Sequence, residues 1–115
     1  MASALARARM IRISPRKVRL VANLIRGKKV SEARDILQFT LKGGAPVMGK
    51  VLAAAVANAE SKAAETQLRI DTDDMLVSDV QVNDGPTLNR FRAAARGRGA
   101  RIRKRTCHIN LVISD

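Results

Sequence analysis

The sequence predicts an α+β fold: three helices packed on a small antiparallel three-stranded sheet, from which a long basic β-hairpin projects. Three observations support this class. Apolar residues recur at helical spacing in three segments before residue 64, and they alternate with polar residues around 76–83 and 107–114. Between these alternating segments lies the stretch 86–106, PTLNRFRAAARGRGARIRKRT, which carries eight basic residues and no acidic one.

The first expected elements are a short strand at 9–13 and a helix directly after it. Ser14 is a suitable N-cap, Pro15 a suitable first helical residue, and Gly27 a suitable stop. Valine, alanine and isoleucine side chains fall on one helical face, and the basic residues largely avoid that face. The helix should therefore turn an apolar face to the core and a basic face outward.

Two further helices are expected before the sheet is completed. Ser31 can cap the second helix, with Glu32 near its positive end. The Gly-Gly-Ala-Pro sequence at 43–46 breaks the chain, and Pro46 can begin a third helix with an apolar stripe over 48–63. The many alanines of this third helix would let a neighbouring element approach closely, so it should lie at the centre of the core.

Two half-buried strands are expected after a polar connection at 68–74. In the first of them, Leu76, Val80 and Val82 should share the buried face. In the last strand, the residues expected to be buried are Cys107, Ile109, Leu111 and Ile113. The hairpin interrupts these two strands, which should pair at its base, and its turn should lie near 96–99, where glycines allow positive φ angles.

The hairpin has little means of stabilising itself. Ten residues per arm at about 3.3 Å each would carry it about 30 Å from the body. A two-stranded ribbon is only marginally stable in water, and the like charges on this one repel each other. An external polyanion would order it, and nucleic acid is the obvious candidate.

The net charge of +12 is concentrated at the two ends of the sequence. Nine basic residues and no acidic one precede Glu32, and eight basic residues follow Asp84, whereas the middle carries nine acidic residues against five basic ones. This pattern predicts one domain with a polyanion-binding face: a globular body at about 9–85 and 107–114, and an arm at about 86–106. Only 2% of residues are aromatic, which favours phosphate and shape contacts over base stacking.

Three segments resemble chemical motifs, and each is better explained structurally. Gly44–Val51 lacks the hydroxyl residue that a P-loop places on Mg²⁺. Cys107 and His108 would point to opposite faces of a strand, which suits a core thiol and an outward histidine. The aspartates at 71–74 lack the glycine and distal glutamate of a calcium loop. No catalytic, cofactor-binding or metal-binding residue is therefore expected, and the chain is not expected to be an enzyme.

The composition also indicates in which cellular compartment the protein is expected. A single cysteine cannot form an internal disulfide, which fits a reducing environment. No secretory signal is expected at residues 1–10, and the longest apolar run, Val51–Ala57, is too short to span a bilayer. A cytoplasmic location with no membrane partner is therefore expected.

The segments SPRKVRLVANLIRGKKVSEARDIL, KVLAAAVANAES and DGPTLNRFRAAARGRGARIRKRTCHINLVIS resemble, in order and spacing, the L-twenty-two family of large-subunit ribosomal proteins. The resemblance covers about residues 9–114. It implies a protein that binds several domains of 23S ribosomal RNA early in assembly of the large subunit. It also implies a body near the exit of the polypeptide tunnel and a hairpin whose tip lines that tunnel. Neighbouring ribosomal proteins and the nascent polypeptide would be further partners, and a cytoplasmic ribosome is expected rather than an organellar one.

The expected RNA-binding residues lie on the first helix and along the arm. On the body they are Ser14, Arg16, Lys17, Arg19, Arg26, Lys28 and Lys29. On the arm they are Arg90, Arg92, Arg96, Arg98, Arg101, Arg103, Lys104 and Arg105. The resemblance implies a tunnel-lining tip made of Ala94, Ala95, Arg96, Gly97, Arg98 and Gly99. The chain departs from the family at Asn89, at Ala93–Ala94 and at Gly99–Ala100, which bears on the conformation of the tip.

A DNA-bending architectural protein with basic β-arms is the alternative. Such arms usually carry an apolar wedge, often proline, that enters a base step. The tip of this arm consists of alanine, arginine and glycine, which disfavours that function. Preferential binding to duplex DNA over structured RNA would favour it.

Overall fold

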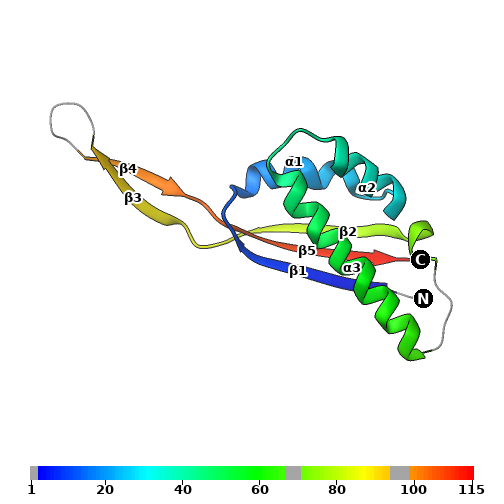
Figure 1. The fold of residues 1–115 in the computed structure, drawn as a ribbon. Coiled ribbons are helices and arrows are strands. Elements are labelled where there is room, and N and C mark those ends of the chain that lie inside the picture. Colours follow the sequence, from blue (N-terminus) through cyan, green and yellow to red (C-terminus); the bar gives the residue numbers. More distant parts are fainter. Residues whose placement is uncertain (1–2, 67–70, 94–98) are drawn as a thin grey trace.

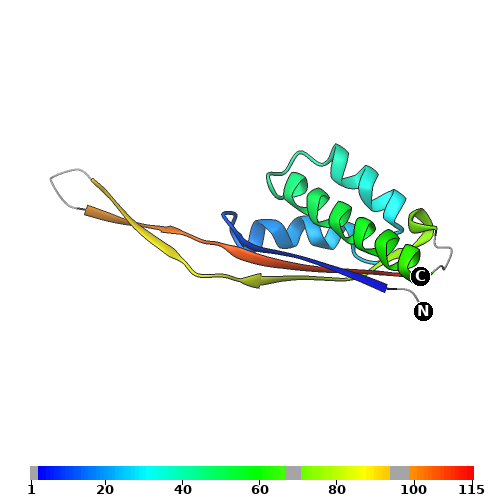
Figure 2. The same ribbon diagram turned by 60° about the horizontal axis from the view of Figure 1, so that its bottom comes forward.

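Three helices lie on one face of a three-stranded antiparallel sheet, and a two-stranded ribbon continues from one end of that sheet (Figures 1 and 2). The computed structural model describes residues 3–66, 71–93 and 99–115. Its elements are β1 (Ser3–Ile11), α1 (Pro15–Ile25), α2 (Val30–Phe39), α3 (Gly44–Thr66), the 3-10 turn η1 (Thr72–Asp74), β2 (Leu76–Asp84), β3 (Leu88–Ala93), β4 (Gly99–Lys104) and β5 (Cys107–Ser114). The predicted α+β class, with its three helices and its sheet, is confirmed.

The central strand of the sheet is β5, which pairs antiparallel with β1 on one side and β2 on the other. The alternation predicted for it is confirmed, because Cys107, Ile109, Leu111 and Ile113 are all buried against the helices. Between them lie half-buried residues on the open face of the sheet. This strand supplies the largest share of the core from the sheet.

The first strand was predicted with the wrong bounds. It begins at Ser3 and ends at Ile11, and it pairs with β5 from Ser3 opposite Ser114 onward. Its buried side chains are Ala4 and Ala6, which are weak strand formers and so gave little signal in the sequence. The predicted segment 9–13 covers only the end of the strand, where the register shifts and Met10 has a positive φ of 57°.

One residue of β2 breaks the predicted alternation. Val80 and Val82 are buried as expected, but Leu76 is exposed and Val77 is buried in its place. The register with β5 shifts between Val77 and Asp79, so an extra residue reverses which side chains face the core. Composition alone does not reveal such a bulge.

The first helix begins and ends as predicted, with Ser14 at the N-cap, Pro15 as its first residue and Gly27 just past its end at a φ of +80°. The second helix begins at Val30, not after a cap at Ser31. The reason is tertiary, because the chain before it pairs with β2: Val30 N donates to Met75 O and Val77 N donates to Lys28 O, both at 2.8 Å. The third helix begins two residues before Pro46, at Gly44.

Both outer edges of the sheet receive hydrogen bonds from helix side chains. On β1, the amide of Asn58 donates to Leu5 O at 2.9 Å, and Lys62 Nζ donates to Ser3 O at 3.2 Å. On β2, the edge carbonyls accept hydrogen bonds from the guanidinium groups of Arg19 and Arg26 on α1. Such donors satisfy edge carbonyls that could otherwise pair with another chain. Within the described ranges, no helix combines the length and apolar character needed to cross a bilayer.

Candidate nucleic-acid interface

The two strands of the ribbon leave the body through a tight junction between Gly85 and Thr106. Gly85 N donates to Thr106 O at 3.0 Å, and Thr106 Oγ1 donates to Pro86 O at 2.5 Å. Thr106 is the one buried polar residue among the side chains that the structure describes, at 1% exposure. A Cβ at position 85 would lie 2.5 Å from Thr106 Oγ1, so glycine is required for this approach. The junction therefore fixes where the ribbon starts.

Replacing Thr106 by valine is expected to lower the free energy of unfolding by about 1 to 2 kcal/mol, because the junction loses a part-buried hydrogen bond donated by the buried Thr106 hydroxyl. Urea denaturation would measure this. Thr87→Val is the matched control, since Thr87 is exposed at the same junction. Equal effects of the two substitutions would mean that the buried hydroxyl does not hold the junction.

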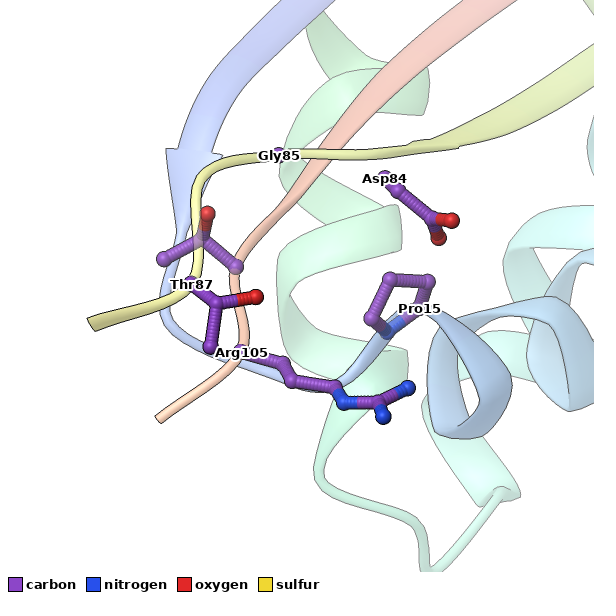
Figure 3. A pocket seen from close by; sticks show the side chains of 6 residues that line it. Pro15, Asp84, Gly85, Thr87 and Arg105 are labelled. Atoms are coloured by element: carbon purple, nitrogen blue, oxygen red, sulfur yellow. The ribbon is translucent and has the colours of Figure 1, made fainter. Parts of the chain in front are cut away.

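Beside this junction lies a hollow of about 220 Å³, lined by Pro15, Asp84, Gly85, Thr87, Arg105 and Thr106 (Figure 3). The exposed Arg105 side chain extends along it toward the start of α1 (Figure 3). Asp84 on the other side is paired with Arg19 at 3.2 Å, so its negative charge is compensated. Arg105 has no ion-pair partner among the residues that the structure describes. The base of the ribbon and the start of α1 therefore adjoin at this hollow.

The register of the ribbon places no two basic residues directly opposite each other. The pairs from base to tip are Leu88–Lys104, Asn89–Arg103, Arg90–Ile102, Phe91–Arg101, Arg92–Ala100 and Ala93–Gly99. No pair joins two basic residues, and like charges directly opposite one another would be destabilising. A slip of one residue would place Arg90 opposite Arg101 or Arg103. The charge pattern therefore helps to select the register while leaving the ribbon strongly basic.

The tip lies outside the described residues, except for Gly99 at the start of β4. Ala94, Ala95, Arg96, Gly97 and Arg98, with the expected turn, therefore remain predictions. The same holds for the expected RNA contacts along the arm, where the structure gives the backbone pairing of β3 and β4.

The basic residues predicted on the body fall into two groups. Arg16, Lys17, Lys28 and Lys29 are exposed, and the structure gives their side chains no hydrogen-bond or ion-pair partner among the described residues. Ser14 is half-buried, and its main-chain oxygen accepts from Lys17 N at 3.1 Å. These side chains are available to phosphate groups without breaking any contact described within the chain.

Arg19 and Arg26 differ because they join α1 to the edge of β2. Arg19 Nε and Nη2 donate to Val82 O at 3.2 and 3.0 Å, and Arg26 Nη2 donates to Val80 O at 2.7 Å. Arg26 Nη1 also donates to Asn23 Oδ1 at 2.6 Å. The sequence showed only their basic character, although their separation of two helical turns places both on one flank of α1, from which they reach the edge of β2. Their contact with RNA stays a prediction, while both side chains donate hydrogen bonds to the edge of β2.

Replacing Arg26 by alanine is expected to cost about 1 to 2 kcal/mol of folding free energy, because a part-buried carbonyl of β2 loses a charged donor. Arg16→Ala on the same helix should change stability by less than about 0.5 kcal/mol, since that side chain is exposed without a described partner. Thermal unfolding of the two variants would compare them. A fully stable Arg26→Ala protein would assign this arginine to the ligand-binding surface alone.

The residues that resemble catalytic, metal-binding or nucleotide-binding motifs are part of the core, the sheet or a helix. Cys107 is a buried free thiol, and burial raises its pKa above the ordinary value, so the thiol stays protonated and unreactive. His108 Nδ1 accepts from Met10 N at 3.1 Å, at the irregular end of β1. Gly44–Val51 forms the first turns of α3. No group of three or more histidine, cysteine, aspartate or glutamate side chains suited to a metal occurs in the described ranges.

Comparison with known proteins agrees with a ribosomal assignment. A family model described as "Ribosomal protein L22p/L17e" matches residues 6–114. The "Large ribosomal subunit protein uL22" of Pediococcus pentosaceus is 50% identical over 113 residues, covering 98% of this chain and 92% of that protein. The protein of the same name from Oceanobacillus iheyensis is 50% identical over 108 residues, covering 94% and 91%. The Staphylococcus aureus protein is 52% identical over 108 residues, covering 94% and 88%.

Proposed function

The chain belongs to the ribosomal protein L22p/L17e family, whose members are structural and non-enzymatic constituents of the large ribosomal subunit, and from this premise we propose that it binds 23S ribosomal RNA during early assembly of that subunit. The body sits near the exit of the polypeptide tunnel. The ribbon passes inward through several RNA domains, and its tip lines the tunnel beside the nascent polypeptide.

The observation that carries this proposal is the unbalanced charge of the ribbon. Eight basic residues lie between Pro86 and Thr106 without an acidic one, and the register opposes none of them to another in the pairs described. Two strands with this charge have few stabilising contacts of their own. RNA phosphates would neutralise the basic side chains and order the ribbon at the same time.

The body adds a second basic surface at the end from which the ribbon extends. Pro15 at the start of α1 and Arg105 at the base of the ribbon line the same hollow (Figure 3). Arg16 and Lys17 follow Pro15 directly in the sequence, so the basic residues of α1 begin near the base of the ribbon. If both surfaces together engage about ten phosphates, binding should fall by several orders of magnitude over a modest rise in salt. A charged surface of this kind also speeds association with RNA.

Assembly of large subunits from particles that lack this protein tests the proposal. The chain should enter the particle in moderate salt and protect 23S RNA from chemical probes along two surfaces, one for the body and one for the ribbon. In a second arm, structured ribosomal RNA should bind better than duplex DNA of equal length. The relatives compared above are named as ribosomal proteins, so they give the DNA-bending alternative no support. A preference for duplex DNA would contradict the proposal.

Deleting Ala94–Gly99 is expected to leave the body folded and bound to RNA, because the core cluster that the structure describes is built by the helices and the three-stranded sheet of the body. The shortened arm should widen the tunnel of the assembled subunit, which electron cryomicroscopy would show. Unfolding of the shortened protein when free, or loss of RNA binding, would contradict this assignment of the tip.

A further inference from the structure

The three-stranded sheet has one face that no helix of the described structure covers. Figure 2 shows the sheet nearly edge-on, with α1, α2 and α3 all on one side of it. The uncovered side, which we name the open face, carries the side chains that alternate with the core residues, since successive residues of a strand point to opposite faces. The polar side chains at its centre are Arg7 and Arg9 of β1, His108 and Asn110 of β5, and Gln81 and Asn83 of β2.

The strand register arranges these side chains in rows across the sheet. Arg7 lies opposite Asn110, and Asn110 lies opposite Gln81, so one row crosses all three strands. His108 lies opposite Asn83 in the next row toward the ribbon. Strands about 4.8 Å apart place the neighbours in a row within reach of a single ligand. The centre of the open face is therefore a compact group of hydrogen-bonding side chains.

Most of these side chains have no partner within the described chain. Asn110 is half-buried, and its amide makes no hydrogen bond to a described residue. Arg7, Arg9 and Asn83 are exposed and are equally without a described partner. The exception is Gln81, whose Nε2 donates to Asp79 Oδ2 at 3.2 Å. Unused amide groups favour a ligand that can both accept and donate hydrogen bonds.

His108 adds a donor whose position follows from its other hydrogen bond. Its Nδ1 accepts from Met10 N at 3.1 Å, so the neutral ring carries its hydrogen on Nε2. Nε2 has no partner among the residues that the structure describes. The second ring nitrogen is thus left to donate to an acceptor outside the chain.

The composition of the open face favours RNA over a protein partner. The centre of a protein interface is depleted in charge and rich in aromatic and other apolar side chains. Arginine, amide and imidazole groups stand at the centre here, while Leu5 and Val112 lie opposite each other toward the end away from the ribbon. Bases of a single strand need stacking platforms, and β1, β2 and β5 contain no phenylalanine, tyrosine or tryptophan.

The position of the open face favours the same ligand. Two of its strands, β2 and β5, are those that continue into β3 and β4 of the basic ribbon. His108 follows Arg105, at the base of the ribbon, by only three residues. RNA that neutralises the base of the ribbon therefore lies beside the open face as well.

We propose that the open face docks on the minor groove of an RNA helix adjoining the RNA that the ribbon binds. This groove is wide and shallow in A-form RNA and displays 2′-hydroxyl groups, which both donate and accept hydrogen bonds. Asn83, Asn110 and His108 bond to these sugars, and Arg7 and Arg9 at the β1 edge contact phosphates. The inference rests on the proposed function and extends it, because α1 and the open face lie on opposite sides of the sheet (Figure 2).

Replacing Asn83 and Asn110 together by aspartate tests the chemistry. The shapes are nearly unchanged, but amide donors become carboxylates that repel phosphates, so the Kd for 23S RNA should rise about tenfold. Gln38→Glu with Ser61→Asp is the matched control, since it changes the net charge equally at exposed positions of α2 and α3. Fluorescence anisotropy should show less than a twofold change for the control. Equal losses in the two pairs would overturn the inference.

An iron chelate on Leu5→Cys tests the position of the RNA and leaves every proposed contact intact. Leu5 is 38% exposed on the open face, and the native Cys107 is buried, so the reagent reaches the new thiol alone. In assembled large subunits, hydroxyl radicals from this site should cut both strands of one RNA helix. The same chelate on Gln38→Cys, on α2, should leave that helix uncut.

The outcomes of the chelate experiment separate the inference from the proposed function. Uncut 23S RNA around position 5, in subunits that contain the labelled chain, would mean that protein or solvent covers the open face. That result would overturn the inference and leave the proposed function in place. A chain that never enters large subunits would overturn both.

Discussion

Replacing Arg101, Lys104 and Arg105 together by alanine is expected to weaken binding to 23S RNA about a hundredfold at moderate salt. Each basic residue that contacts a phosphate contributes about 1 kcal/mol or more, and a loss of about 3 kcal/mol corresponds to that factor. The dependence of log K on log salt should become shallower by about three, because three fewer counterions are released. Filter binding or fluorescence anisotropy across a salt series would measure both quantities.

The free protein should keep its stability in this variant. Arg105 is exposed, the described core is built by the helices and the three-stranded sheet of the body, and removing three like charges relieves repulsion along the ribbon. The triple variant Arg34→Ala, Lys42→Ala and Lys50→Ala is the matched control, since it removes the same charge from exposed positions on the body. A large fall in melting temperature, or an equal loss of affinity in the control, would contradict the role given to the ribbon.

Replacing Ile109 by alanine should lower stability and leave RNA binding by the folded protein unchanged. The expected loss is about 2 to 5 kcal/mol in the free energy of unfolding. Ile109 is fully buried in the central strand, between Ala8 of β1 and Val82 of β2, so its truncation leaves a cavity in the core. Domains of this size are stable by only about 5 to 15 kcal/mol, so the effect should be prominent in urea denaturation. The salt dependence of RNA binding by the folded fraction should stay unchanged.

Val112→Ala provides the comparison within the same strand. Val112 lies half-buried on the open face of the sheet, so its truncation should cost well under half as much. Similar losses at the two positions would indicate that the helices do not cover the face on which Ile109 lies.

Local sequence patterns predicted a helix or strand closely where a single clear pattern covers the whole element. The strand at Cys107–Ser114 alternates strictly, and the first helix has a Ser-Pro start and a glycine stop, so both were predicted closely. The first strand was predicted too late in the chain, because the buried residues Ala4 and Ala6 have low strand propensity and only pairing with β5 orders them. The start of α2 was wrong for a related reason, since main-chain pairing with β2 outweighs a serine cap.

Two features of the structure could not be predicted from the composition of the sequence. The bulge between Val77 and Asp79 depends on how β2 meets β5, and it reverses the side chains that face the core. Arginine is equally suited to phosphates and to backbone carbonyls, so the sequence could not separate Arg19 and Arg26, which hold β2, from Arg16. Only the position of an acceptor decides between the two roles.

Hydrogen–deuterium exchange of the protein, free and bound to ribosomal RNA, tests most directly whether the body folds by its own core and the ribbon depends on RNA. The amides of β5 should be protected equally in both states, because they lie in the centre of the sheet. The amides of β3 and β4 should exchange within seconds in the free protein and become protected in the complex. Equal and strong protection of the ribbon without RNA would contradict this division between body and ribbon.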